Sequence, residues 1–200
     1  MTEPCFFAPE RWETPEFVLR SFLPGDGKSL ATALDSSYEH LKRFMYWAIP
    51  REDPAECEAR VRRFRARYLL HEDFIIAILS PDESEVLGGT GFHLREGPFA
   101  EKRCEAGMWI RSDLAGQGLG KKVLTSLLEW AWAEWTFERI SWHCSVENIG
   151  SRKVAEGAGM VREGTLRRAL VVRGEEPHDL AVYSALRVER SGHPSPGPRP

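Results

Sequence analysis

The sequence lacks any apolar run approaching the roughly 20 residues that a helix needs to cross a bilayer. It also lacks an excess of positive charge, because the formal net charge of its 200 residues is −3. A protein that binds nucleic acid through phosphate contacts normally presents a basic surface. We therefore expect neither a membrane nor a nucleic acid as its partner.

Cysteines are few and show no regular spacing. The four, Cys5, Cys57, Cys104 and Cys144, include no C-x-x-C pair, the usual signature of small zinc sites and dithiol redox sites. The N-terminal segment contains prolines and acidic residues and does not resemble a signal peptide. We expect a cytoplasmic protein without a metal site.

The length fits one domain with short extensions. A hydrophobic fraction of 42%, with ten Phe and seven Trp, is enough for a core. We predict an N-terminal extension over 1–14, the domain over 15–188 and a tail over 189–200. Residues 191–200 contain four prolines and no apolar anchor, so we expect this part of the tail to be disordered.

The order of the expected elements indicates a mixed α/β sheet covered by helices. Asp53 and Pro54 form a good N-cap and first-turn pair for one helix, and a final hairpin is expected around residues 173–175. Strands are expected at 17–23, 74–79, 86–94, 104–111, 139–146, 160–168 and 180–188, and helices at 28–44, 54–70, 118–136 and 149–156. The third helix should bury one apolar face, which consists of Leu124, Leu127, Leu128, Ala131 and Trp135.

Two surface features have both a bland and a functional interpretation. The arginines at 60, 62, 63, 65 and 67 could contact an anion, but interspersed acidic residues favour a solvated helix face. Trp132 falls outside the apolar face of its helix. It could therefore mark a homodimer contact, although a partly buried single Trp is the more ordinary situation.

A glycine-rich loop, Ala115-Gly-Gln-Gly-Leu-Gly-Lys121, precedes the longest predicted helix. Glycines let the backbone approach an anion, and a helix start offers free N–H groups. Lys121 and Lys122 occupy a first turn where the helix dipole favours acidic residues, which favours a phosphate ligand over an ordinary glycine-rich turn. The GxxxxGK[ST] motif is absent, and Val123 stands where the dinucleotide motif GxGxxG needs its last glycine.

Further motifs flank this loop in a fixed order. They are Glu105-Ala-Gly-Met-Trp-Ile110, Cys144-Ser-Val-Glu-Asn148, Ser151, Glu163-Gly164, and His178-Asp179 with Tyr183. Together with the loop, they resemble the GNAT superfamily of acetyltransferases, and most closely its RimJ/RimL-type branch of N-terminal acetyltransferases. The resemblance covers about residues 15–188 and preserves the order and spacing of every motif.

This resemblance implies a single-domain α/β fold with a largely antiparallel sheet and a central parallel strand pair that splays, here 104–111 and 139–146. Acetyl-CoA, with no metal, is implied as the acyl donor between those strands. The residues implied to bind it are Trp109 and Ile110 through edge amides, Gln117, Gly118, Leu119, Gly120 and Lys121 at the pyrophosphate, and Asn148 and Ser151 at the pantetheine arm.

The reaction needs an acid that protonates the leaving thiolate. Many relatives carry a Tyr seven residues after the Asn, but this chain has Ala155 there. The Rim-type alternative is Ser151, which could otherwise be a simple polar residue in the first turn of its helix. Cys144 is more simply a small residue beside the thioester than a nucleophile, because direct transfer needs no acyl-enzyme.

The base is harder to assign. RimL-like relatives carry a Glu on the strand after Gly164, at a position that is Leu170 here. Glu105 is our first substitute, followed by His143 and His178. Each of these could instead be structural, and an amine of low pKa would need no strong base.

The acceptor is expected to be a primary amine, and the resemblance favours a protein N-terminus. The alternatives are the transfer of acetyl to a small-molecule amine, the transfer of a bulkier acyl group, and a non-catalytic acyl-CoA-binding module. The segments expected to cover the substrate, about 24–50 and 168–178, show no pattern that distinguishes them.

Overall fold

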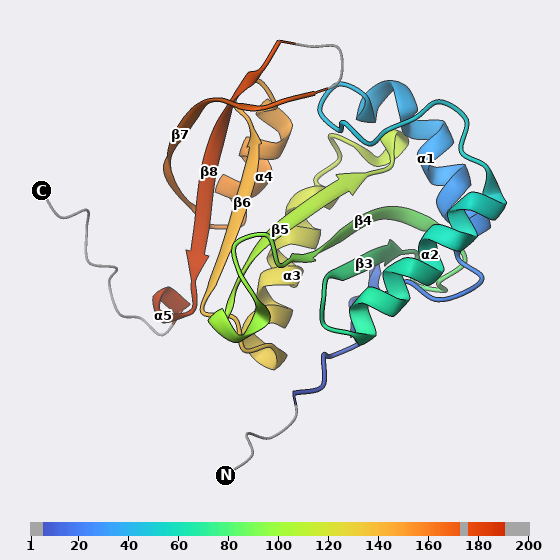
Figure 1. The fold of residues 1–200 in the computed structure, drawn as a ribbon, viewed down its shortest axis with the longest axis horizontal. Helices are drawn as coiled ribbons and strands as arrows, with labels where there is room; N and C mark the ends of the chain where they lie inside the picture. Colours follow the sequence, from blue (N-terminus) through green and yellow to red (C-terminus); the bar gives the residue numbers. More distant parts are fainter. Residues whose placement is uncertain (1–5, 173–175, 191–200) are drawn as a thin grey trace, which may run out of the picture.

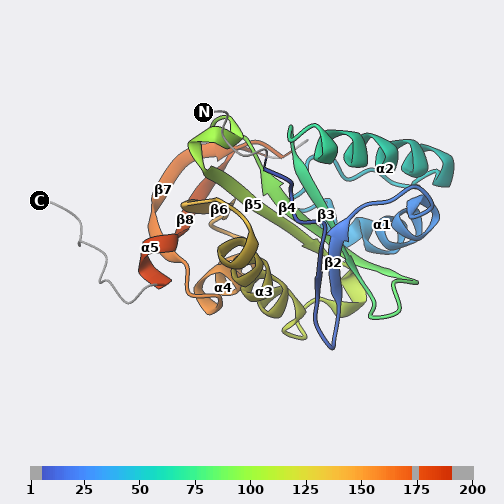
Figure 2. The same ribbon diagram turned by 90° about the horizontal axis from the view of Figure 1, so that it is seen from below.

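The computed structural model describes residues 6–172 and 176–190, in which one mixed sheet carries helices on both faces (Figures 1 and 2). The strands are β1 (Arg11–Glu13), β2 (Val18–Ser21), β3 (Phe74–Leu79), β4 (Val86–His93), β5 (Arg103–Ile110), β6 (Arg139–Ser145), β7 (Val161–Leu170) and β8 (His178–Leu186). The helices are α1 (Gly27–Leu41), α2 (Pro54–Leu69), α3 (Leu119–Glu134), α4 (Ile149–Gly157) and α5 (Arg187–Arg190), with 3-10 turns at Phe99–Glu101 and Ser112–Leu114. The hairpin turn expected at 173–175 and the tail at 191–200 lie outside the described residues.

The sheet has eight strands in the order β1-β2-β3-β4-β5-β6-β8-β7. All neighbours are antiparallel except β5 and β6, which run parallel. This arrangement confirms the predicted fold class, a largely antiparallel sheet with one central parallel pair.

The parallel pair is joined over only part of its length. Its register runs from Arg103 opposite Arg139 to Ala106 opposite Trp142. Beyond that point, β5 still pairs with β4 and β6 still pairs with β8. The two central strands therefore separate without losing their outer partners, and Figure 1 shows them diverging.

Helices cover the two faces of the sheet unequally. Helices α3 and α4 lie on one face, and α1 and α2 lie on the other, over the N-terminal strands (Figure 2). The larger core packs α3 against side chains such as Cys104 and Ala106 of β5. The apolar face predicted for α3 is buried, which confirms Leu124, Leu127, Leu128, Ala131 and Trp135 as core residues.

Helix α2 begins as the sequence predicts. The Asp53 carboxylate accepts hydrogen bonds from the backbone N–H groups of Ala55 and Glu56, and Pro54 occupies the first turn. Helix α1 packs closely on it, because a Cβ on Gly27 would lie only 2.4 Å from the Cα of Glu58. The arginine-rich face of α2 is neutralised within the chain by ion pairs, namely Arg60–Glu52, Arg62–Glu58, Arg65–Glu10 and Arg67–Asp73.

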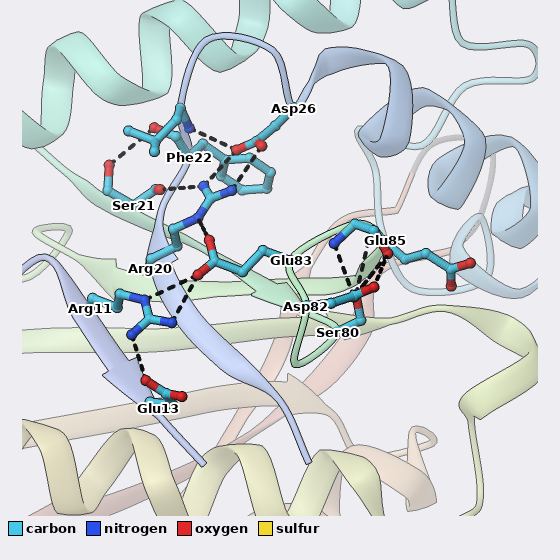
Figure 3. Close-up of polar contacts among 12 residues, drawn as sticks. Arg11, Glu13, Arg20, Ser21, Phe22, Asp26, Ser80, Asp82, Glu83 and Glu85 are labelled. Atoms are coloured by element: carbon cyan, nitrogen blue, oxygen red, sulfur yellow. Dashed lines mark hydrogen bonds and ion pairs between the residues drawn. The ribbon is translucent and has the colours of Figure 1, made fainter. Parts of the chain in front are cut away.

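A buried arginine ties the first strands to the following loops (Figure 3). The Arg20 guanidinium lies 2.7 Å from Asp26 and 2.6 Å from Glu83, and the residue is only 8% exposed. Arg11 on β1 reaches the same Glu83 carboxylate at 2.9 Å. This shared carboxylate anchors β1 to the sheet. Strand β1 was not predicted, and it lies within the segment 1–14 that was expected to be an N-terminal extension.

The last strand differs from its predicted range of 180–188. It spans His178–Leu186 and is followed by α5. The Arg187 guanidinium donates to four backbone carbonyls at the end of α3 and in the following turn. Strand β8 therefore ends at Leu186, and the next side chain, that of Arg187, is held against the end of α3 by these bonds.

Candidate active site

A cavity of about 450 Å³ lies where β5 and β6 separate. Its walls come from the end of β5, from β6, from the glycine loop, from the start of α4 and from the end of α1. The residues predicted for the cofactor that line it are Trp109, Ile110, Gly118, Gly120, Lys121, Asn148 and Ser151. Segments far apart in the sequence thus meet around one space.

The glycine loop presents an open helix start to this cavity. Gly116 and Gly118 have φ values of +78° and +86°, and a Cβ on either would meet nothing within 4 Å. Gly118 is the N-cap of α3 and supplies no side-chain hydrogen bond. The first amides of α3 are therefore free of a side-chain cap and suit an anion.

Two other loop residues predicted to bind cofactor point their side chains elsewhere. The Gln117 side chain donates to the Asp113 carbonyl at 2.6 Å, and Leu119 packs against the larger core. Lys121 lines the cavity, whereas Lys122 forms an ion pair with Glu16. The cation that faces the cavity from this turn is thus Lys121.

The start of α4 places Ser151 in the cavity wall. The Asn148 side chain caps the helix by accepting from the Ser151 N–H at 3.0 Å. The Ser151 hydroxyl accepts a hydrogen bond from the Trp142 indole N–H at 3.0 Å. Since the indole only donates, the hydroxyl keeps its own proton available for donation.

Cys144 lies beside this serine and is buried. Burial raises the pKa of its thiol, and the nearby Ser151 hydroxyl and Arg152 guanidinium offset this only in part. A thiol with a raised pKa is a poor nucleophile. Cys144 is thus a buried core residue behind the cavity lining, which does not favour a nucleophilic role.

Glu105 lies outside the cavity lining, on the other face of β5. Its strand neighbours Cys104 and Ala106 point into the core with α3, so Glu105 points to the opposite face. Its carboxylate lies 2.6 Å from Arg95 and 3.2 Å from the Nδ1 of His143. Burial alone raises the pKa of Glu105, but His143 and Arg95 together lower it below its ordinary value.

The same contact acts in the other direction on His143. The hydrogen bond to Glu105 raises the pKa of the His143 imidazole above its ordinary value, despite partial burial. Glu96, which the sequence analysis did not single out, lies 4.0 Å from the His143 Nε2 and accepts a hydrogen bond from Ser141. A titratable cluster therefore lies outside the cavity lining, on the face of the sheet opposite α3.

His178, the third candidate base, is held elsewhere. Its Nδ1 lies 3.0 Å from the Ser145 hydroxyl and 3.5 Å from the Glu147 carboxylate. On the neighbouring strand β7, His178 pairs with Leu170. Leu170 stands at the position where RimL-like relatives are expected to carry a Glu.

Several cavity residues were not predicted. They come from the end of α1 and the segment after it, from β5, from β6 and from α4, and are His40, Leu41, Phe44, Met45, Met108, Trp142, Gly150, Lys153 and Val154. Most are apolar residues without a motif, so only the folded chain brings them together. A cavity largely lined by apolar groups with a few polar ones is typical of small-molecule sites.

Among the described residues, neither a candidate metal site nor a membrane span is found. Over 6–172 and 176–190, no group of three or more His, Cys, Asp or Glu side chains is arranged to hold a metal ion. In the same ranges, none of the helices combines the length and the apolar character that crossing a bilayer requires.

Sequence comparison decides the family. The profile of the acetyltransferase (GNAT) domain matches residues 16–161, most of the chain. The chain belongs to the GNAT acetyltransferase family. A curated relative of this domain, the "Putative ribosomal N-acetyltransferase YdaF" of Bacillus subtilis (strain 168), is 26% identical over 179 residues, which are 88% of this chain and 93% of the relative.

Solved structures show the same fold. RimL, the ribosomal L7/L12 alpha-N-protein acetyltransferase in complex with coenzyme A, matches this GNAT domain with a TM-score of 0.78 at 20% identity, covering 86% of this chain and 95% of that one. The microcin C7 self immunity acetyltransferase MccE, in complex with acetyl-CoA and AMP, also gives 0.78, at 18% identity, covering 86% and 93%. These matches show that the chain shares the fold of both enzymes, and the family match together with the similarity to YdaF confirms the predicted resemblance.

Proposed function

We propose that this protein transfers the acetyl group of acetyl-CoA to a primary amine, and that a protein N-terminal α-amine is its first candidate acceptor. The observation that carries this proposal is the separation of β5 from β6 beyond Ala106 and Trp142, with a cavity at the opening. An elongated thioester fits such a gap, because its arm can pair with the free edge of β5 like an added strand.

The residues around the gap suit the parts of acetyl-CoA, which supplies an activated acetyl group as a thioester. Trp109 and Ile110 pair with β4 on one side and keep their other edge free. The uncapped start of α3, with Gly118 and Lys121, suits the pyrophosphate. The binding role of Asn148 is to hold the start of α4 in place beside the arm.

Two groups would handle the protons of the reaction. Ser151 would act as the acid, since its hydroxyl lines the cavity and its proton is not used by Trp142. Glu105 would supply the carboxylate of the basic group on the opposite face, where it is already paired with His143. The acceptor amine would then enter from that face and meet the thioester in the gap.

Support for a protein acceptor comes from relatives. YdaF carries the name of a putative ribosomal N-acetyltransferase, and RimL is named for ribosomal L7/L12. MccE, with its AMP complex, keeps a small-molecule acceptor as the alternative. The lining residues at the end of α1, Phe44 and Met45, suit an apolar group beside the amine in either case.

We also keep three wider expectations as proposals. The domain spans 15–188, and the preceding extension contributes β1. A cytoplasmic location is supported by the free, buried Cys57, Cys104 and Cys144. A homodimer through Trp132 has less support, because the Arg187 guanidinium lies 5.3 Å from its ring centroid and already covers it.

Release of free thiol from acetyl-CoA, followed over a panel of N-terminal peptides and small amines, tests the function. We expect turnover with at least one class of amine, and the class that turns over fastest identifies the acceptor. Tight acetyl-CoA binding without turnover on any amine would favour a non-catalytic binding module. Absence of acetyl-CoA binding would contradict both readings.

A further inference from the structure

A cluster of titratable side chains lies beside the β5–β6 gap, outside the cavity lining and on the face of the sheet opposite α3. Trp142 packs in the larger core with α3, and the next residue on β6, His143, therefore points to the opposite face of the sheet. Trp142 is also the last β6 residue paired with β5. His143 is thus the first β6 side chain beyond the closed end of the gap, and Figure 1 shows the two strands parting beyond their paired segment.

The carboxylate contacts of His143 leave one of its ring nitrogens available. Its Nδ1 lies 3.2 Å from a Glu105 oxygen, within hydrogen-bonding distance, so Nδ1 carries the proton and donates it. Its Nε2 lies 4.0 Å from Glu96, which is too far for a hydrogen bond. In this tautomer the Nε2 lone pair is free, and the Glu96 carboxylate is close enough to stabilise a positive imidazolium.

Glu105 is in a poorer position to accept a proton. One of its oxygens contacts Arg95 and the other contacts His143, and its side chain is only 12% exposed. These partners hold its pKa below the ordinary value, so the carboxylate is a weak base. The same contact strengthens His143 as a base by raising the pKa of its imidazole.

We propose that His143 takes the proton of the acceptor amine on its Nε2, and that Glu105 is a positioning residue that fixes the tautomer and orientation of the ring. The inference rests on the proposed function and assigns its basic step. One N–H bond of the protonated, ammonium form of the acceptor breaks while an Nε2–H bond forms, and the electron pair of that bond stays on the nitrogen, which then attacks the thioester carbonyl. The imidazolium then returns its proton to solvent.

Other charged groups also act on His143. Arg95 acts through Glu105, and the remaining neighbours are Glu96 before β5, Arg139 on β6 and Glu163 on β7. Glu105 and Glu96 raise the pKa of His143, whereas Arg139 lowers it. Because the hydrogen bond to Glu105 is the largest of these effects, Glu105 is the partner whose removal should move the titration most.

Two readouts test the assignment. NMR titration of the His143 imidazole in the full-length protein without substrate gives its pKa directly, and the pH dependence of kcat/KM gives the pKa of the group that must be deprotonated. We expect both to lie above the ordinary histidine value of 6.5 and to agree. His143→Gln should lose the rising limb and about 100-fold in kcat/KM, with acetyl-CoA affinity unchanged.

Glu105→Gln separates positioning from proton transfer. If Glu105 acts through His143, the limb remains and its midpoint moves to lower pH together with the NMR titration. Loss of the limb in Glu105→Gln, with His143 still titrating, would identify Glu105 as the acceptor and overturn the proposal. Neither the wild-type titration nor this variant requires a change at position 143, so a folding defect in His143→Gln would not prevent the test.

His93 offers a matched comparison. It also has a carboxylate partner, with its Nδ1 2.8 Å from Asp73, but it lies on β4, one strand further from the gap. The His93→Gln variant should therefore retain the rising limb of the kcat/KM profile. Loss of this limb in His93→Gln and not in His143→Gln would overturn the assignment. If the wild type acetylates amines and the His143→Gln variant keeps the pH profile of the wild type, this inference alone is refuted. If the wild type shows no turnover, the proposed function is refuted as well.

Discussion

The two sides of the β5–β6 gap are built from different chemistry. On the cavity side, glycines, backbone amides and the Ser151 hydroxyl dominate, with Lys121 as the cation of the glycine loop. Outside the cavity lining, on the face of the sheet opposite α3, Glu105, His143 and Glu96 form a titratable cluster. The cavity side is suited to holding a fixed anion and thioester, and the cluster is suited to exchanging a proton. Substitutions on the first side should change binding or thiol release, and those on the second should change pH dependence.

The largest effect is expected at the glycine loop. Gly118→Asp would place a carboxylate near the proposed pyrophosphate site, and two like charges about 4 Å apart repel by about 4 kcal/mol at an effective dielectric of 20. We expect acetyl-CoA affinity to fall at least about 100-fold in isothermal titration calorimetry. Gly118→Asn is the matched control, because Asn has the same shape, no charge and a tolerance for the positive φ of +86°. Equal losses in both variants would show that backbone strain, not charge, is responsible.

A smaller effect is expected at the hydroxyl on the same side. Ser151→Ala should lower kcat about 10- to 100-fold through loss of the acid, while acetyl-CoA affinity changes by less than about 3-fold because the backbone N–H that Asn148 caps remains. The variant also leaves the Trp142 indole N–H without its acceptor. Ser151→Thr restores a hydroxyl and should recover most of the turnover. Wild-type kcat in Ser151→Ala would exclude this residue as the acid.

The same comparison explains what could be predicted from the sequence. The cavity side depends on local motifs: the loop leads directly into α3, and Asn148 caps the helix that carries Ser151 three residues later. Such short spacings are visible in the chain itself. The element order followed from periodicity and turn signals, and the parallel pair was implied by the resemblance to the GNAT superfamily.

The parts that were not predicted depend on contacts between distant segments. Glu96 meets His143 across 47 residues of sequence, and β1 is held by Glu83 on a remote loop. The apolar lining at Phe44 and Met45 comes from a segment without a motif, because the helix predicted over 28–44 ends at Leu41. No local spacing indicates such contacts, because they exist only once the sheet has formed.

The smallest predicted effect tests whether the polar side of the sheet also contributes to stability. Glu163 on β7 accepts from Arg139 of β6 at 2.7 and 2.6 Å and from Ser184 of β8 at 2.7 Å, so it links three strands. The Arg139 guanidinium is the main cause that lowers the pKa of Glu163 to about 2 from an ordinary 4.5. A group whose pKa is lowered by folding stabilises the fold above its unfolded pKa, and that stabilisation is lost as the pH falls from about 4.5 toward about 2.

Because the Glu163 side chain is 39% exposed, solvent screening limits the contribution to less than about 1 kcal/mol. We therefore expect the free energy of unfolding, measured with urea at about pH 6 and about pH 3, to change less with pH in Glu163→Gln than in the wild type. Glu176→Gln is the matched control, since Glu176 pairs with Arg168 but its side chain is 89% exposed. The Glu176→Gln variant should show the same pH dependence of the unfolding free energy as the wild type. If this pH dependence were reduced equally in both variants, the effect would come from the loss of any surface carboxylate and not from the link between β6, β7 and β8.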